Sequence, residues 1–271
     1  MPRLPFWKMS GAGNDFIVVD EAACEGLDRS WLARKLCARA LSVGADGLIV
    51  MSEVDREQVR IHFYNPDGSD AEMCGNGSRC AARYAVARGL VDPGHFRLLT
   101  DSGDLEVLAG DGAFQVVMPE PGNVCFDLME IEEQGERVAV HGVQIGVPHA
   151  VVVLPDVERF SDEDLTRIGR ALRYDAHFPH GTNTNFVSLV PGKPLRQRTY
   201  ERGVEALTKA CGTGSTATAF VMTTRFGLDF PVELTVDGGR LRVDRRDGRL
   251  WLSGDARLIA TGEIEPDAFS W

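Results

Sequence analysis

Short runs of alternating apolar and polar residues recur along the chain, and this pattern is typical of strands with one buried face. In the first half, a strand pair is expected over 4–20, turning near Gly11-Ala12-Gly13-Asn14-Asp15. Further strands are predicted there over 47–51, 58–64, 95–101, 104–109 and 113–118. In the second half, strands are predicted over 138–146, 149–154, 184–190, 196–201, 231–236, 240–244 and 249–260.

Helices are predicted where the spacing of apolar residues lengthens to that of a helix. One is expected over 29–40, and Ser161 with Asp164 resembles a capping box for a second helix that ends near residue 172. Two more are predicted over 75–88 and 212–226. Each of these two is followed by a Gly-Leu pair, whose glycine can take the left-handed conformation that ends a helix.

The last two helices begin with the same motif, Cys-Gly-x-Gly-Ser. It reads Cys74-Gly75-Asn76-Gly77-Ser78 in the first half and Cys211-Gly212-Thr213-Gly214-Ser215 in the second. An alternating run that ends in a tyrosine precedes each cysteine by ten or eleven residues. The chain therefore reads as a duplicated unit of the α+β class, an α/β roll. We expect two pseudo-symmetric domains, each a curved sheet or barrel of short strands wrapped around a central helix.

The best candidate for a domain boundary is Pro119-Glu120-Pro121-Gly122, because two prolines interrupt any strand ladder and a glycine follows. We expect an N-terminal domain over 1–119 and a C-terminal domain over 120–257, with the tail 258–271 returning to the first. Duplicated units tend to pack about a pseudo-twofold axis. Such packing would direct the two cysteine motifs at one cleft.

Composition narrows the classes of partner. The 271 residues carry a formal net charge of -11 and a pI near 5.1, which argues against nucleic acid and anionic membranes as partners. No apolar stretch approaches the length of a signal peptide or a membrane span. We expect a soluble, cytoplasmic protein that acts on a small molecule.

The six cysteines include no Cys-x-x-Cys pair, so zinc and thioredoxin-like sites are disfavoured and no metal is expected. Cys24, Cys37, Cys80 and Cys125 lack a motif and are interpreted as core residues. Cys74 and Cys211 differ because each stands at a predicted helix N-terminus. The helix dipole and free backbone N–H groups there favour anions, and such placement can lower a thiol pKa from about 8.5 to about 3.5–7.5.

Paired thiols of this kind suit one reaction in particular. If a bound α-amino acid places its Cα between them, one thiolate can remove the α-proton while the other thiol returns a proton to the opposite face. The helix termini would stabilise the charge that develops on the carboxylate. The sequence therefore predicts stereochemical inversion without a cofactor.

The motifs taken together resemble one family, the diaminopimelate epimerases, which are pyridoxal-phosphate-independent isomerases with one cysteine in each domain. The resemblance runs through Lys8-Met9-Ser10-Gly11-Ala12-Gly13-Asn14-Asp15-Phe16, Phe63-Tyr64-Asn65-Pro66-Asp67-Gly68-Ser69, Cys74-Gly75-Asn76-Gly77-Ser78-Arg79-Cys80, Pro148-His149, Tyr200-Glu201-Arg202-Gly203 and Ala210-Cys211-Gly212-Thr213-Gly214. It implies an isomerase that interconverts LL- and meso-diaminopimelate, for lysine and peptidoglycan precursors, with no cofactor. A homodimer is a further expectation.

The resemblance also implies roles for single residues. The acid and base thiols would be Cys74 and Cys211, and His149 and Glu201 would help to set their protonation. Four positions match those that hold the reacting α-carboxylate: Gly75, Asn76, Gly212 and Thr213. Four others match positions that hold polar groups of the substrate, largely at its distal end: Asn14, Asn65, Asn183 and Arg202. Glu201 is expected to contact substrate as well.

Other interpretations remain open at this stage. The nearest alternative keeps the fold and both thiols but acts on another amino acid, as a proline-type or histidine racemase. Asn76 and Arg202 argue against it, since proline racemase-like proteins tend to carry histidine after Cys-Gly and a guanidinium suits a second carboxylate. A phenazine-biosynthesis relative would lack the cysteine pair. A thiol redox or metal-binding protein would instead use a Cys74–Cys211 disulfide or zinc.

The chain departs from the family pattern at a few positions. Val147 stands where many members have asparagine before Pro-His, and Gly47 stands where glutamine is common. The segment from Glu201 to Cys211 is one residue longer than in several members, with Leu207 in place of a common glutamate. These changes concern the distal end of the substrate and leave the proton chemistry unaltered.

Overall fold

The chain forms two units that repeat one order of elements, described by a computed structural model that covers residues 3–71, 74–110, 113–190 and 192–270. Unit 1 comprises Met1–Val116 with Gly254–Trp271, and unit 2 comprises Val117–Ser253. The sequence predicts boundaries after residues 119 and 257, whereas the two units divide after residues 116 and 253. Trp271, the end of the expected tail, lies outside the described residues.

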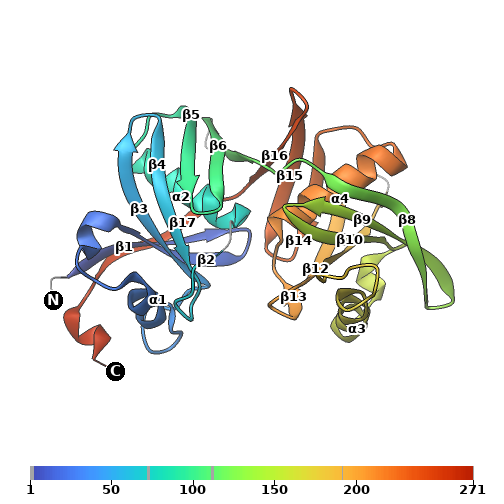
Figure 1. Ribbon diagram of the computed structural model, residues 1–271, viewed down its shortest axis with the longest axis horizontal. Helices are drawn as coiled ribbons and strands as arrows, with labels where there is room; N and C mark the ends of the chain where they lie inside the picture. The colour runs from blue at the N-terminus through green and yellow to red at the C-terminus, as the bar shows by residue number, and fades with distance from the viewer. Residues whose placement is uncertain (1–2, 72–73, 111–112, 191, 271) are drawn as a thin grey trace. The chain divides into compact units, whose positions relative to one another are not determined.

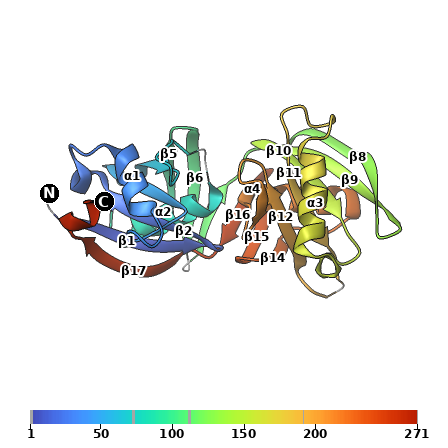
Figure 2. The same cartoon turned by 90° about the horizontal axis from the view of Figure 1, so that it is seen from below.

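Unit 1 contains two α-helices within its described residues, α1 (Arg29–Cys37) and α2 (Gly75–Ala87). Its strands are β1 (Leu4–Gly11), β2 (Asn14–Asp20), β3 (Gly47–Asp55), β4 (Gln58–Tyr64), β5 (Gly94–Thr100), β6 (Gly103–Gly110), β7 (Ala113–Val117) and β17 (Arg257–Ile264). Short 3-10 helices cover Glu21–Cys24 and Pro266–Phe269. The last strand, β17, runs antiparallel beside β1 (Figure 2).

The sheet of unit 1 curves around α2. Antiparallel pairs join β17 to β1, β1 to β2, β3 to β4, β5 to β6 and β6 to β7, while β2–β3 and β4–β5 are parallel. Helix α2 contacts β1, β2, β3 and β6, so strands from distant parts of the sheet lie against one helix (Figure 1). Most of its residues are buried, and they are mainly small, which lets the strands approach closely.

Unit 2 has α3 (Asp162–Arg173) and α4 (Gly212–Phe226) in the same places in its sequence of elements. Its strands are β8 (Gly122–Glu133), β9 (Glu136–Ile145), β10 (Val147–Val153), β11 (Asn183–Ser188), β12 (Leu195–Glu201), β13 (Ala206–Thr208), β14 (Val232–Val236), β15 (Gly239–Arg246) and β16 (Arg249–Gly254). A 3-10 turn covers Val157–Arg159.

The pairing in unit 2 repeats that of unit 1. Antiparallel pairs join β8 to β9, β9 to β10, β11 to β12 and β14 to β15, while β10–β11 and β12–β14 are parallel. The added strand β13 pairs with β12. Helix α4 contacts β9, β10, β11 and β15. The predicted α+β class, with a curved sheet around a central helix in each of two similar halves, is therefore confirmed.

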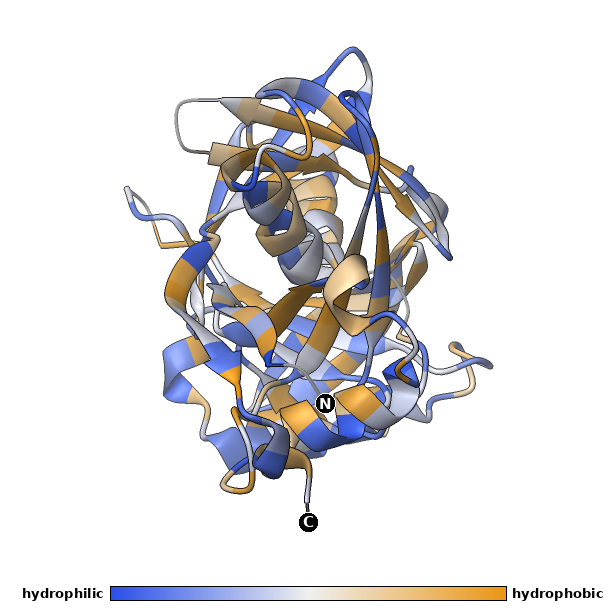
Figure 3. Ribbon diagram, turned by 90° about the vertical axis from the view of Figure 1, so that its left-hand side faces the viewer, coloured by the Kyte–Doolittle hydropathy of each residue, from blue (hydrophilic) through white to orange (hydrophobic). Residues whose placement is uncertain are grey.

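The apolar faces of the strands and helices form the cores. In unit 1, Leu32 and Leu36 of α1 pack against Ile17, Leu48 and Val50 of the sheet. In unit 2, the corresponding helix α3 buries Leu165, Ile168 and Leu172 against its own sheet. Figure 3 shows the alternation of hydrophobic and hydrophilic residues along the strands, which is the pattern that predicts them from sequence.

The structure confirms the local signals that begin and end the predicted helices. Ser161 and Asp164 form a capping box at the start of α3, and Gly227 ends α4 with φ 72°. Gly89 follows α2 with φ 68°. Helix α1 ends at Cys37, short of the expected residue 40, because Ala38 is extended and Ala40 takes φ 67°.

Two regions differ from expectation. Strand β8 was not predicted, since none of its residues is buried and its only strand partner within the described residues is β9, with two register shifts. Cys125 lies on this strand and is exposed, so its interpretation as a core residue was wrong, whereas Cys24, Cys37 and Cys80 are buried. The single strand expected over 249–260 is divided into β16 and β17.

Of the helices within the described ranges, none has both the length and the hydropathy to span a bilayer.

Candidate active site

Both motif cysteines occupy the N-cap position of a central helix. Cys74 precedes α2 with φ −116° and ψ 111°, and Cys211 precedes α4 with φ −125° and ψ 112°. The two backbones thus turn into their helices in nearly the same way. At each position the N–H groups of the first helical turn lack intrahelical acceptors, and the positive end of the helix dipole lies there. Both features favour a bound anion.

The glycines of the motif let the sheets approach the helices. A Cβ on Gly77 would lie 2.7 Å from Phe63 Cε1, and one on Gly214 would lie 2.1 Å from Asn185 Oδ1. Side chains are therefore excluded at both places. The backbone N–H of Gly214 also donates to Cys211 Sγ at 3.4 Å. The Cys211 residue is 6% exposed.

In unit 1, two of the predicted substrate-binding residues contact one another. Asn76 Nδ2 donates to Asn14 Oδ1 at 2.7 Å, and Asn14 Nδ2 donates to Asp46 Oδ2 at 3.2 Å. Asn14 begins β2 and Asn76 lies in the first turn of α2. The structure therefore brings these two residues together at the N-terminal end of the helix that Cys74 caps.

A buried arginine holds the amide of Asn76 in place. Arg79 Nη2 donates to Asn76 Oδ1 at 2.7 Å, and Arg79 Nη1 donates to the Gly75 carbonyl at 3.1 Å. The Arg79 side chain is fully buried, and its Nε has no partner among the described residues. Burial lowers the pKa of the guanidinium, and negative charge on Cys80, Cys74 or Asp255 acts in the opposite direction.

Asn65 lies in the turn that follows β4. Its backbone N–H donates to the Ser69 carbonyl at 2.8 Å, and its Nδ2 donates to Ser69 Oγ at 3.0 Å. These bonds match a local turn role for asparagine. No described bond joins Asn65 to the Asn14–Asn76 pair, so its role toward substrate stays a prediction.

In unit 2, three of the predicted residues lie together at the ends of neighbouring strands. His149 of β10 stands opposite Asn183, the first residue of β11. Asn183 Oδ1 accepts a 2.8 Å bond from the backbone N–H of Arg202, which directly follows β12. The Arg202 guanidinium donates through Nη1 to the His180 carbonyl at 3.0 Å.

His149 is buried and is held by an amide that the sequence analysis did not single out. Its Nδ1 lies 3.1 Å from Nδ2 of Asn185, two residues along β11. Its Nε2 has no partner within the described residues. Burial and the positive charge of Arg202 lower the pKa of His149 to about 3, so the ring is neutral at physiological pH.

Glu201, the last residue of β12, is a carboxyl in a sheltered position. Burial raises its pKa above the usual range, and the neighbouring Thr208 acts in the opposite direction. A carboxyl whose pKa is raised by burial suits a group that exchanges protons with a reacting centre.

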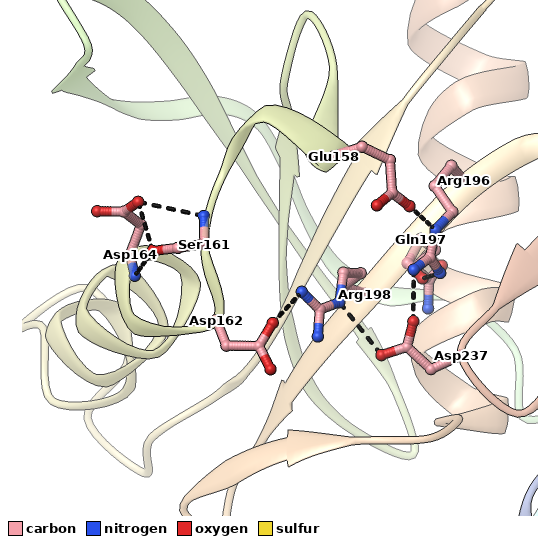
Figure 4. A network of polar contacts seen from close by, with 8 residues as sticks. All are labelled: Glu158, Ser161, Asp162, Asp164, Arg196, Gln197, Arg198 and Asp237. Carbon is pink, nitrogen blue, oxygen red and sulfur yellow. Dashed lines mark hydrogen bonds and ion pairs between the residues drawn. The ribbon is translucent and has the colours of Figure 1, made fainter.

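Strand β12 separates this buried site from a charged surface. Arg196 and Arg198 reach Glu158, Asp162 and Asp237 on one face (Figure 4). On the other face, Gln197 Nε2 donates to Thr199 Oγ1 at 3.1 Å and to Ser215 Oγ at 3.2 Å. Ser215 lies in the first turns of α4. The alternation of the strand therefore places its buried polar side chains toward the helix that begins after Cys211.

Arg79 and Asn185 are the residues that sequence reasoning missed. The sequence spacing of each to a predicted site residue could have indicated it. Arg79 is three residues after Asn76 on one helix, so the two side chains are neighbours. Asn185 is two residues after Asn183 on one strand, so both point to the same face.

Outside the predicted site, the described residues form a surface depression but no metal-ligating cluster. An open depression of about 770 Å³ follows the exposed face of α3, between Asp162 and Tyr174, and contains none of the predicted residues. Within the described ranges, no group of three or more His, Cys, Asp or Glu side chains is placed to share a metal ion.

Comparison with known proteins agrees with the motifs. Residues 6–121 and 142–259 match the family described as diaminopimelate epimerase. The chain is 37% identical to the diaminopimelate epimerase of Methanocella arvoryzae, covering 98% of this chain and 99% of the relative. It is also 37% identical to that of Aquifex aeolicus, covering 99% of this chain and 100% of the relative.

Solved structures support the fold. A phenazine biosynthesis protein of the PhzF family from Bacillus anthracis superposes with a TM-score of 0.75 at 14% identity, covering 98% of this chain and 100% of that one. A hydroxyproline epimerase from Agrobacterium vitis gives a TM-score of 0.69 at 15% identity, covering 99% and 94%. The full-length similarity to curated relatives, together with the paired N-cap cysteines, means that the chain belongs to the diaminopimelate epimerase family.

Proposed function

We propose that this protein is a diaminopimelate epimerase, an isomerase that interconverts LL- and meso-2,6-diaminoheptanedioate in the biosynthesis of lysine and peptidoglycan precursors. The observation that carries the proposal is the matched N-cap placement of Cys74 and Cys211. The similarity of the whole chain to curated diaminopimelate epimerases supports the choice of substrate.

The proposed reaction needs one thiolate and one thiol. The thiolate removes the proton at Cα, and the C–H electron pair moves into an enolate of the carboxylate. The thiol then gives its proton to the opposite face of Cα, and the two sulfur atoms exchange protonation states. No electrons leave the substrate, so the reaction requires no redox cofactor and no electron-accepting carbonyl group.

Backbone and side-chain donors bind the two ends of the substrate in this proposal. Gly75, Asn76, Gly212 and Thr213 hold the α-carboxylate near the helix N-termini, where developing negative charge is stabilised. Asn14, Asn65, Asn183 and Arg202 hold the distal polar groups. The Asn14–Asn76 bond and the Asn183–Arg202 bond support the idea that these residues act in pairs.

His149 and Glu201 are assigned to the control of proton transfer. The neutral, buried state of His149 and the raised pKa of Glu201 support different tasks for the two. We assign proton exchange with the reacting groups to Glu201, and hydrogen bonding to His149. Glu201 also contacts substrate in this proposal.

The proposal extends to location and assembly. We place the enzyme in the cytoplasm, where its small-molecule substrate is made, and we propose a homodimer. The largely exposed strand β17, with Leu258 and Ile259 on its surface, supports a second copy as its partner. Light scattering of the purified protein tests this: a dimer mass is expected, and a monomer at all accessible concentrations contradicts it.

The substrate is tested by proton–deuterium exchange. The reduced enzyme in deuterium oxide is offered LL-diaminopimelate, proline, histidine and other amino acids, and deuterium at Cα is followed by NMR. We expect exchange and inversion with diaminopimelate and little with the others. Faster exchange with a monocarboxylate amino acid would move the assignment to a racemase of that amino acid on the same fold.

A further inference from the structure

Three buried polar side chains on neighbouring strands of unit 2 form one chain of hydrogen bonds. They are His149 on β10, Asn185 on β11 and Thr199 on β12, each at most 2% exposed. Asn185 Nδ2 lies 3.1 Å from His149 Nδ1, and Asn185 Oδ1 lies 3.1 Å from Thr199 Oγ1. Buried networks of this kind hold side-chain orientation firmly when their members are paired.

The fold itself does not require this polar chain, because the repeat in unit 1 fills the same positions with hydrocarbon. His149 pairs with Asn183 where Phe16 pairs with Gly47 in the matching parallel strands. Two residues further along, Asn185 stands opposite Thr199, and Ile49 stands opposite Phe63. The unit 1 counterparts, Phe16, Ile49 and Phe63, are all buried. Burying polar groups where apolar ones suffice indicates a task other than packing.

The orientation of the Asn185 amide follows from its neighbours. Its Nδ2 also lies 3.4 Å from the Ala150 carbonyl, which can only accept a hydrogen bond. Thr199 Oγ1 accepts from Gln197 Nε2, so its own hydrogen is free to reach Asn185 Oδ1. The amide nitrogen therefore faces His149. An N–H facing Nδ1 requires that nitrogen to accept, which leaves the ring proton of a neutral imidazole on Nε2.

We propose that Asn185 is a positioning residue that fixes His149 in the tautomer protonated at Nε2, so that the imidazole supplies one N–H donor to the site. The role of that donor rests on the proposed epimerase function, whereas the tautomer does not. Nε2 is buried without an acceptor among the described residues. Such a donor costs about 1–3 kcal/mol until it is paired, so it suits an anion, either a thiolate or a substrate carboxylate.

The tautomer also excludes His149 as a base. Its basic nitrogen, Nδ1, already accepts a hydrogen bond from the Asn185 amide. Burial and Arg202 hold its pKa at about 3, so the ring does not gain a proton near neutral pH. Proton transfer then falls to the thiols and to Glu201.

The same amide connects His149 to the helix that Cys211 caps. Asn185 Oδ1 occupies the space where a Cβ of residue 214 would lie, at 2.1 Å. Gly214 in turn donates its N–H to Cys211 Sγ. A shift of the Asn185 side chain would therefore disturb both the histidine and the first turn of α4.

The proposal is tested on the wild-type protein by NMR of ¹⁵N-labelled histidine, with the His149 signals assigned by their loss in His149→Gln. We expect a protonated Nε2 and an unprotonated Nδ1, unchanged from pH 8 to pH 5. A ring protonated at Nδ1, or an imidazolium that forms near neutral pH, would overturn the proposal. This measurement needs no mutation of Asn185 and no turnover.

Asn185→Asp supplies a second test, because a carboxylate accepts where the amide donates. We expect the His149 proton to move to Nδ1, with kcat for α-proton exchange reduced by about 10²-fold or more, as for loss of one oriented donor, and with KM changed less. Asn123→Asp, the same change on the exposed strand β8, should leave both unchanged. A wild-type tautomer in folded Asn185→Asp would contradict the positioning role.

The tautomer of His149 and the epimerase function can be tested separately. If the tautomer is as expected but diaminopimelate shows no α-proton exchange, the proposed function is wrong and the positioning role of Asn185 stands. If exchange occurs but His149 carries its proton on Nδ1, the epimerase assignment stands and this inference is wrong.

Discussion

The side-chain amide of Asn76 donates a 2.7 Å hydrogen bond to the side-chain oxygen of Asn14, a residue 62 positions earlier in the chain. The bond joins the first turn of α2 to the start of β2. The carbonyl of the same Asn76 amide accepts from Arg79. Asn76 is thus oriented from two sides, and the proposed contact with the substrate carboxylate would use its second N–H hydrogen.

Arg79→Lys tests this orientation. Lysine keeps the charge but not the planar pair of donors, so the oxygen of Asn76 loses its partner. We expect a loss of about 1–3 kcal/mol in the free energy of unfolding, with a raised KM for diaminopimelate. Urea unfolding and steady-state kinetics measure both. Arg97→Lys, on the exposed side of β5, is the matched control. Equal effects in the two variants would show that Arg79 does not orient Asn76.

Gly214→Ala tests the close approach of Asn185 to α4. The added methyl would meet Asn185 Oδ1 at 2.1 Å, so the amide must move. We expect a cost of about 1–3 kcal/mol in unfolding free energy, typical of overpacking, and a lower kcat. Gly122→Ala is the control, because nothing lies within 4 Å of its Cβ position. Similar stability and turnover in both variants would argue against a rigid contact here.

The neutral state of His149 predicts a dependence of stability on pH. Its pKa is about 3 in the folded protein and about 6.5 when unfolded. The unfolded chain therefore binds the proton first as pH falls, and stability present above about pH 6.5 is lost below it. The slope approaches about 1.4 kcal/mol per pH unit.

His149→Gln should remove that contribution to the slope between pH 6.5 and pH 5, while His95→Gln, an exposed histidine of β5, should not. Urea unfolding at several pH values gives the slopes. An unchanged slope in His149→Gln would mean that the folded protein accepts the proton readily, contrary to the buried, neutral ring described above.

Arg202→Met tests the distal end of the substrate. Loss of a guanidinium that pairs with a desolvated carboxylate costs on the order of 2–5 kcal/mol, so kcat/KM for diaminopimelate should fall by several orders of magnitude. The backbone N–H of Arg202 still reaches Asn183, so the fold should survive. Val147→Asn, which adds an amide two residues before His149, should change KM only modestly. Near-normal turnover by Arg202→Met would point to a substrate with one carboxylate.

Local signals in the sequence were sufficient for much of the fold. The cysteine motifs, the capping box at Ser161 and the glycine after α4 act through backbone geometry within a few residues, and each is found as expected. Strand β8 escaped prediction because none of its residues is buried, so its sequence needs no alternation of apolar and polar residues. Its backbone is held by pairing with β9. The end of α1 depends on the positive φ of Ala40, which its sequence does not signal.

The site was predictable only in part for a similar reason. The thiols and their glycines form one contiguous motif that carries its own chemistry. Arg79 and Asn185 act through partners that folding brings to them, and an arginine or asparagine in isolation has many possible roles. The polarity of the His149–Asn185–Thr199 chain becomes evident only when its strands are aligned with the apolar ones of unit 1.

The central claim is that inversion needs both thiols, and α-proton exchange by Cys74→Ala and Cys211→Ala tests it most directly. Each variant, with folding confirmed by circular dichroism, is incubated with LL-diaminopimelate in deuterium oxide under reducing conditions. The wild type should invert the substrate with deuterium at Cα, also after hydroxylamine treatment, and neither variant should invert it. Inversion at most of the wild-type rate by either folded variant would contradict the two-thiol account.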